Sequence, residues 1–167
     1  NPKHSKEART VAPRLMYRLH SDTSKKKVGA NVFGKQNVQR YILTGDEFSD
    51  YLYLNFCSRK DEVKHVMLKQ VDLLNNKHAP NTVAEHQSDS GTEYKNRKLH
   101  KGMRKRNCEL RFSTPYIKYE NGWIESRMEE INVMARAMMF RGNAEPCDWP
   151  YAYNHAVKLR NILPTPS

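Results

Sequence analysis

The chain has 167 residues, and its 29 Lys and Arg against 18 Asp and Glu give a formal net charge of +11. That length fits one domain with enough buried surface to fold without a disulfide or a structural metal. No apolar run approaches the roughly 18 residues of a membrane span, and periodic apolar segments exclude a wholly disordered chain. The charge predicts an anionic partner, with nucleic acid favoured over an acidic membrane surface.

Residues 1–14 are polar and basic with two prolines, which predicts a linker or extended arm ahead of a domain at 15–167. The absence of an initiator Met suggests an internal piece of a longer polypeptide. The cysteines are odd in number and far apart, and the histidines are scattered, so we expect reduced intracellular thiols and no zinc finger. The three cysteines are Cys57, Cys108 and Cys147.

The first half predicts three strands and a helix. Weak alternation indicates a strand at 15–22, and two aromatic and aliphatic segments at 39–44 and 51–56 flank a turn at 45–50, as in a hairpin. From Ser58, a candidate N-cap, apolar residues recur every three or four positions to about residue 76, which predicts an amphipathic helix.

In the second half, short apolar runs predict strands at 82–86 and 108–112, and 113–121 is expected to be a loop. Gly122 introduces a helix with one apolar stripe, and a last helix covers 148–161, with Trp149 as its anchor. The methionines at 134, 138 and 139 are expected to pack in the core or a dimer interface. The order predicts an α/β fold with a five-stranded mixed sheet flanked by helices.

Three carboxylates stand at element ends: Asp22 after the first strand, Asp89 after the strand that follows the crossover, and Glu125 early in the long helix. If the two strands lie side by side and parallel, Asp22 and Asp89 meet at one edge of the sheet. Clustered carboxylates suit Mg²⁺, and a pair of such ions supports phosphodiester displacement. Each carboxylate alone also fits a turn, a cap or a first helical turn, and Glu129 is a rival third ligand.

Several blocks in order resemble the catalytic core of retroviral and retrotransposon integrases, in particular that of copia-type LTR retrotransposons. Between Asp89 and Glu125 lie 35 residues, the spacing of the family's DD35E motif. The local blocks that resemble the family are Arg18-Leu19-His20-Ser21-Asp22, residues 41–49, Asp89-Ser90-Gly91-Thr92-Glu93-Tyr94 and Asn121-Gly122-Trp123-Ile124-Glu125. The resemblance runs from about residue 13 to the end.

The resemblance implies an RNase H-like fold and two Mg²⁺ or Mn²⁺ ions held by Asp22, Asp89 and Glu125. It implies an enzyme that processes the 3′ ends of element DNA and transfers them into target DNA, acting as a homo-oligomer on double-stranded DNA, with no membrane and no small-molecule substrate. It also implies action in the nucleus after a cytoplasmic virus-like-particle stage. A decayed DNA-binding or assembly module and a hydrolytic RNase H-like nuclease remain alternatives.

The chain departs from the family beside the catalytic Glu, where Ser126 and Met128 replace the usual Arg and Asn, and in the loop 118–120. Basic residues from 95 to 106, with no acid among them, predict phosphate contacts, although a nuclear-import signal or a solvated helix face also fits. The residues expected to contact nucleic acid are Lys95, Arg97, Lys98, Lys101, Lys118, Tyr119 and Arg127.

Overall fold

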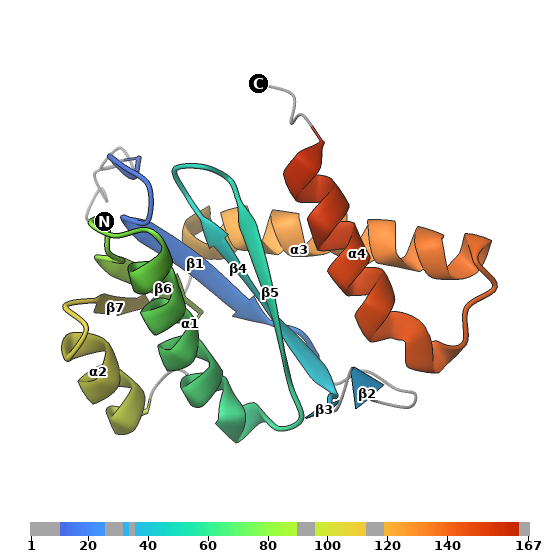
Figure 1. Cartoon of the computed structure of the whole chain (residues 1–167), viewed down its shortest axis with the longest axis horizontal. Helices are drawn as coiled ribbons and strands as arrows, with labels where there is room; N and C mark the ends of the chain where they lie inside the picture. The colour runs from blue at the N-terminus through green and yellow to red at the C-terminus, as the bar shows by residue number, and fades with distance from the viewer. Residues whose placement is uncertain (1–10, 26–31, 34–35, 90–95, 113–118, 164–167) are drawn as a thin grey trace, which may run out of the picture.

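The computed structural model describes residues 11–25, 32–33, 36–89, 96–112 and 119–163 (Figure 1). The strands are β1 (Arg18–Thr23), β2 (Val32–Phe33), β3 (Gln36–Asn37), β4 (Arg40–Asp46), β5 (Leu52–Cys57), β6 (Glu85–Ser88) and β7 (Glu109–Phe112). The α-helices are α1 (Val63–Lys77), α2 (Arg97–Arg104), α3 (Tyr119–Arg141) and α4 (Trp149–Ile162), and two 3₁₀ turns, η1 (Lys60–Glu62) and η2 (Pro146–Asp148), precede α1 and α4.

Five strands form one mixed sheet in the order β5-β4-β1-β6-β7, and β2 and β3 pair separately. The hairpin β4–β5 and the pair β1–β4 are antiparallel, whereas β6 lies parallel to both β1 and β7. The predicted hairpin and the predicted five-stranded mixed sheet are therefore confirmed. The predicted turn at 45–50 is too long, because Gly45 and Asp46 still belong to β4.

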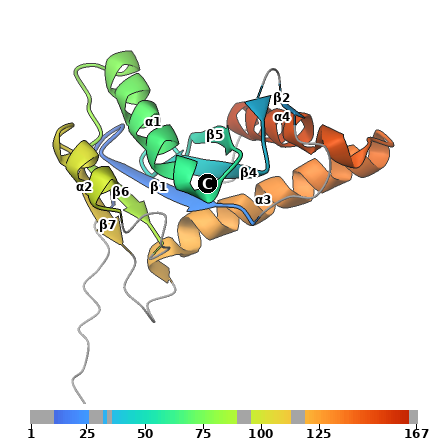
Figure 2. The ribbon, with the colours of Figure 1, turned by 90° about the horizontal axis from the view of Figure 1, so that it is seen from below.

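The sheet separates two hydrophobic cores, and both views place the pair α1–α2 apart from the pair α3–α4 (Figures 1 and 2). Alternation along β4 illustrates this division, because Ile42 belongs to the core under α1 and α2 while Tyr41 and Leu43 belong to the core under α3 and α4. The apolar stripe predicted for α3 is confirmed at Ile124 and Ile131, which are fully buried.

The methionines of α3 pack against this second core as partly buried side chains, which confirms their predicted role in packing. Trp149 at the start of α4 is buried, and its ring lies 5.7 Å from that of Phe56 and 5.8 Å from that of Tyr153. It therefore anchors α4 to β5, as its position in the sequence predicts.

Two predicted helix starts are wrong. Ser58 does not cap α1: its backbone N–H donates to the Glu62 carboxylate, and its hydroxyl donates to the Asn37 carbonyl, while Glu62 occupies the N-cap position. Helix α3 begins at Tyr119 rather than Gly122, so the predicted loop at 113–121 fails at least over 119–121. A glycine in the first turn of a helix costs little, because packing of the apolar face outweighs its low propensity.

The predicted arm at 1–14 lies mostly outside the described residues, and its last residues contact the fold. Ala12 is buried, and the Arg14 guanidinium donates to the Thr82 carbonyl at 3.1 Å. In the described part of the chain, no helix has the length and apolarity needed to cross a bilayer. The three cysteines are all free thiols, as predicted.

Candidate nucleic-acid processing site

The site begins at the edge of the sheet where β1 and β6 end. Ser21 and Ser88 are partners in the parallel ladder, and Asp22 and Asp89 each follow one residue later. Adjacent strands lie about 4.8 Å apart, so the two aspartate backbones are neighbours. Both aspartates are half-buried. The structure therefore places Asp22 and Asp89 side by side, as the order of the strands predicts.

Asp22 lies on the face of the sheet that carries α3. Side chains alternate across a strand, so Asp22 shares its face with His20, whose ring lies 5.2 Å from that of Trp123 in α3. Its Oδ1 accepts a hydrogen bond from the Thr23 N–H at 2.7 Å. The pKa of Tyr41 is raised above its ordinary value, mainly by burial and then by the charges of Tyr153 and Asp22. The Asp22 carboxylate is therefore close enough to influence Tyr41 in the core under α3.

Glu125 is exposed and lies in the second turn of α3, directly after the buried Ile124. Its rival Glu129 accepts a hydrogen bond from Arg136 at 3.1 Å. Among the described residues, no three His, Cys, Asp or Glu side chains are gathered closely enough to hold a metal ion. Asp22 and Asp89 nevertheless occupy neighbouring backbone positions, and carboxylates are the donors that Mg²⁺ prefers. The described structure does not gather Glu125 with the two aspartates.

On the opposite face of the sheet, beneath the two aspartates, lies a buried polar cluster that sequence reasoning missed. The Ser21 hydroxyl is 2.6 Å from that of Thr44 and 3.2 Å from His86 Nε2, and Thr44 donates to Gln70 Oε1 of α1 at 3.0 Å. Burial, reinforced by the neighbouring His20, lowers the pKa of His86 to about 3. The cluster ties β1, β4, β6 and α1 together at the level of the site.

Arg127, one of the residues predicted to contact DNA, is held inside the fold. Its Nε and Nη2 donate to the two carboxylate oxygens of Asp50 at 2.9 and 3.1 Å, and its guanidinium lies 5.5 Å from the Trp123 ring centroid. Asp50 also receives hydrogen bonds from Arg160 of α4. Sequence reasoning took 45–50 as a turn only and missed this link between two helices. The one hint of this link in the sequence is Asp50 itself, an acidic residue at the end of a hairpin turn.

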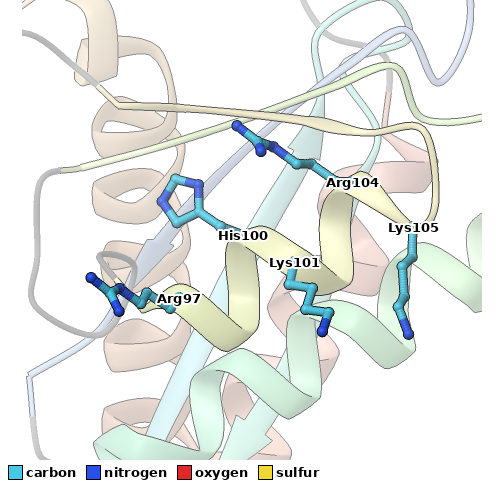
Figure 3. A pocket seen from close by; sticks show the side chains of 5 residues that line it. All are labelled: Arg97, His100, Lys101, Arg104 and Lys105. Carbon is cyan, nitrogen blue, oxygen red and sulfur yellow. The ribbon is translucent and has the colours of Figure 1, made fainter.

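The basic run forms α2, and its cations line an open hollow of about 550 Å³ (Figure 3). Leu99 and Met103 bury the other face of the helix, and Arg106 is bonded to Asp72 of α1 at 2.5 and 2.6 Å. The hollow is lined by Arg97, His100, Lys101, Arg104 and Lys105. The ion pairs found within the described residues include none of these five side chains.

Of the seven residues expected to contact nucleic acid, α2 brings three together, namely Arg97, Lys98 and Lys101. Lys95 and Lys118 lie outside the described residues. Tyr119 is the first residue of α3, and its backbone position is all that is described. The basic surface of α2 also includes His100, Arg104 and Lys105. The sequence could have indicated this grouping, because residues 97, 100, 101, 104 and 105 have the spacing of one helix face.

The mixed sheet of this order, with helices on both faces, is an RNase H-like α/β fold. In agreement, 95% of the chain superposes on 52% of a chain from the CryoEM structure of the simian T-cell lymphotropic virus intasome in complex with PP2A regulatory subunit B56 gamma, with a TM-score of 0.71 and 16% identity. The predicted fold class is thereby confirmed.

Sequence relatives lead to the same group of proteins, although no family model matches the chain. The chain is 26% identical over 135 residues (81% of its length) to the retrovirus-related Pol polyprotein from transposon RE1 of Arabidopsis thaliana. It is 27% identical over 130 residues (78% of the chain) to the corresponding polyprotein from transposon RE2 of the same plant. The chain spans 9% of the length of each. The predicted resemblance to the integrase core of copia-type retrotransposons is confirmed.

Proposed function

We propose that this chain is the catalytic core of an integrase that processes the 3′ ends of retrotransposon DNA and joins them to target DNA. The observation that carries the proposal is the parallel register of β1 and β6, which brings Asp22 and Asp89 to neighbouring positions at one edge of the sheet. The likeness to transposon Pol polyproteins and to an intasome chain supports the same assignment.

The three carboxylates have one role in this proposal, which is to hold divalent cations. Asp22 and Asp89 are the adjacent ligands, and Glu125 is the third, from the helix. If bound there, a pair of Mg²⁺ or Mn²⁺ ions would activate the attacking oxygen and stabilise the leaving oxygen. Water is the nucleophile in end processing and a DNA 3′-hydroxyl in strand transfer. The proposed chemistry has no covalent protein–DNA intermediate.

The basic surface of α2 is the proposed contact for the DNA backbone. Helix α2 starts eight residues after Asp89 in the sequence. Cations on one rigid helix face neutralise phosphates without reading sequence. His100 adds an aromatic ring that lies 5.4 Å from Phe112. Such a surface fits a substrate held by its backbone while its end is presented to the carboxylates.

The wider setting follows from the relatives. The intasome to which the matched viral chain belongs is an integrase–DNA assembly, which supports double-stranded DNA and a second copy of the chain as partners. As a part of a Pol polyprotein, the chain is proposed to be released in a cytoplasmic virus-like particle and to act in the nucleus. A small-molecule substrate and a membrane have no place in this scheme.

The proposal is tested by a strand-transfer and reversal assay on labelled branched DNA with Mn²⁺, comparing the wild-type chain with Glu125→Gln. A metal ligand is worth several kcal/mol of transition-state stabilisation, so joining should fall by at least about 10²-fold. DNA affinity should not change, because the basic surface is intact. Glu129→Gln is the matched control: it lies one turn later on the same helix, loses only an exposed pair with Arg136, and should join DNA normally.

Three outcomes contradict the proposal in different ways. Cleavage of DNA without joining identifies a hydrolytic nuclease of the same fold. DNA binding without any chemistry in either protein identifies a decayed module, for which Ser126 and Met128 are the obvious lesions. Loss of joining in Glu129→Gln but not in Glu125→Gln moves the third ligand to Glu129.

A further inference from the structure

The Trp123 side chain of α3 packs against two cross-strand partners, His20 and Gly45, and we call this pair of residues the seat. His20 of β1 and Gly45 of β4 face each other in the antiparallel ladder, and the Trp123 ring meets both. Its centroid is 5.2 Å from that of His20, and a Cβ placed on Gly45 would be only 2.6 Å from Trp123 Cζ3 and Cη2. Gly45 therefore leaves a gap in the strand surface that the outer ring of the indole fills.

The seat lies next to the proposed site at both of its ends. His20 precedes Asp22 by two residues on the same face of β1. Trp123 precedes Glu125 by two residues in α3, which is about 3 Å of helix rise and about 200° of rotation, so the Trp123 contact fixes the position of this helix turn and not the direction of the Glu125 side chain. In the view of Figure 2, α3 runs beside β1 and β4. The depth at which Trp123 enters the seat therefore sets the distance between the strand that carries Asp22 and the helix turn that carries Glu125.

The outer side of the indole is covered as well. The Arg127 guanidinium lies 5.5 Å from the Trp123 ring centroid, and its two hydrogen bonds to Asp50 fix it there. The half-buried ring therefore contacts the Gly45 backbone, the His20 imidazole and the Arg127 guanidinium. These contacts restrict its position more than those of a loosely packed side chain would.

We propose that Trp123, seated on Gly45 and His20, is the positioning residue that holds the helix turn of Glu125 over the strand of Asp22. The proposal rests on the integrase function proposed above. Trp123 contacts no substrate in this role and acts only through the placement of α3. The same argument makes Gly45 a required small residue, because any side chain there lifts the indole from the sheet.

The size of the effect follows from the contact distance. Carbon atoms pack at about 3.5–4.0 Å, so a methyl group on Gly45 requires the ring to withdraw by about 1 Å. A displacement of about 1 Å in a catalytic group costs on the order of 10²-fold in rate. Gly45→Ala should therefore lower the rate of joining at saturating DNA by about that factor, with the KM for DNA unchanged.

The test compares Gly45→Ala with the double variant Gly45→Ala/Trp123→Phe in the Mn²⁺ joining assay, at a temperature where urea titration shows each protein folded. Phenylalanine lacks the outer ring carbons that the new methyl group meets, so the double variant should recover most of the lost rate. Trp123→Phe alone completes the cycle. The stability control is Val71→Ala, which removes buried methyl groups of α1 from the core on the other face of the sheet, away from Trp123. It should lower stability and leave the joining rate unchanged.

The outcomes separate this inference from the function on which it rests. If the wild type does not join DNA and Glu125→Gln behaves identically, the integrase function is wrong and the positioning role fails with it. If the wild type joins DNA and folded Gly45→Ala joins equally fast, only the positioning role is wrong. A rate loss in Gly45→Ala that Trp123→Phe does not restore, or an equal rate loss in Val71→Ala, also overturns it, because stability alone would then account for the change.

Discussion

Asp50 links three parts of the fold, and removing its charge should destabilise the protein strongly. Its carboxylate receives hydrogen bonds from Arg127 of α3 and Arg160 of α4, and its own carbonyl accepts another from Arg160 at 2.6 Å. Asp50 has a positive φ of 56° in the turn after β4. Asparagine tolerates this conformation, so Asp50→Asn removes the charge and leaves the turn intact.

The expected loss can be worked out from exposure. The Arg160 side chain is only 5% exposed, and those of Asp50 and Arg127 are 24% and 27% exposed. Removing one partner of a fully buried pair costs about 3–5 kcal/mol, and partial exposure places this case at the lower end. Asp50→Asn should therefore lower the free energy of unfolding by about 3 kcal/mol, which in a domain of this size is a fall in Tm of about 6–12 °C.

Urea denaturation at neutral pH, followed by tryptophan fluorescence, measures this loss, because Trp123 and Trp149 lie in the core that Asp50 helps to close. The matched control is Asp61→Asn, whose pair with Arg59 is 64% and 72% exposed and should change stability by less than about 0.5 kcal/mol. A loss below about 1 kcal/mol for Asp50→Asn would refute the reasoning, since it would show that water replaces the carboxylate at Arg160.

Three further outcomes are expected. Because burial lowers the pKa of His86 to about 3, only the unfolded state binds a proton at this residue between about pH 6.5 and pH 3. The free energy of unfolding should therefore fall as the pH drops through this range, by about 2 kcal/mol at pH 5. His86→Gln should remove this pH dependence in urea titrations. Burial raises the pKa of Cys57 to about 11 and that of Cys108 to about 12, so a maleimide should label half-buried Cys147 first, and equal labelling of all three would contradict the fold. Lys101→Glu should weaken DNA binding uniformly across sequences and reduce the salt slope of log K by at least about 1, as measured by fluorescence anisotropy.

Local pattern was sufficient to predict the sheet and the aspartate pair. Alternation in β4 and β5 and a helical period between β5 and β6 leave few ways to order the strands, and a parallel β1–β6 pair puts Asp22 and Asp89 at the same edge. The stripe of α3 was equally readable, because Ile124 and Ile131 repeat at helical spacing. These features depend on residues close in sequence or on one rule of topology.

Contacts between distant residues were not predictable in the same way. The seat of Trp123 joins residues 20, 45 and 123, and a glycine in a strand carries no sign of the ring that will fill its place. Arg127 was taken for a DNA contact because it is basic and follows Glu125, but its side chain turns to Asp50, 77 residues earlier. Its contact with DNA stays a prediction, and the structure gives it a different partner.

The position of Arg127 also bears on which cations remain to hold DNA. Helix α2 is fixed to the core by Leu99 and Met103 and to α1 by the Arg106–Asp72 pair, so its orientation does not depend on a ligand. Its outward cations are therefore presented by a rigid element, and ordering them costs less entropy than ordering a loop. Since Arg127, two residues after Glu125, is paired with Asp50, we expect DNA binding by this chain to come mainly from α2 and the catalytic helix to contribute geometry rather than charge.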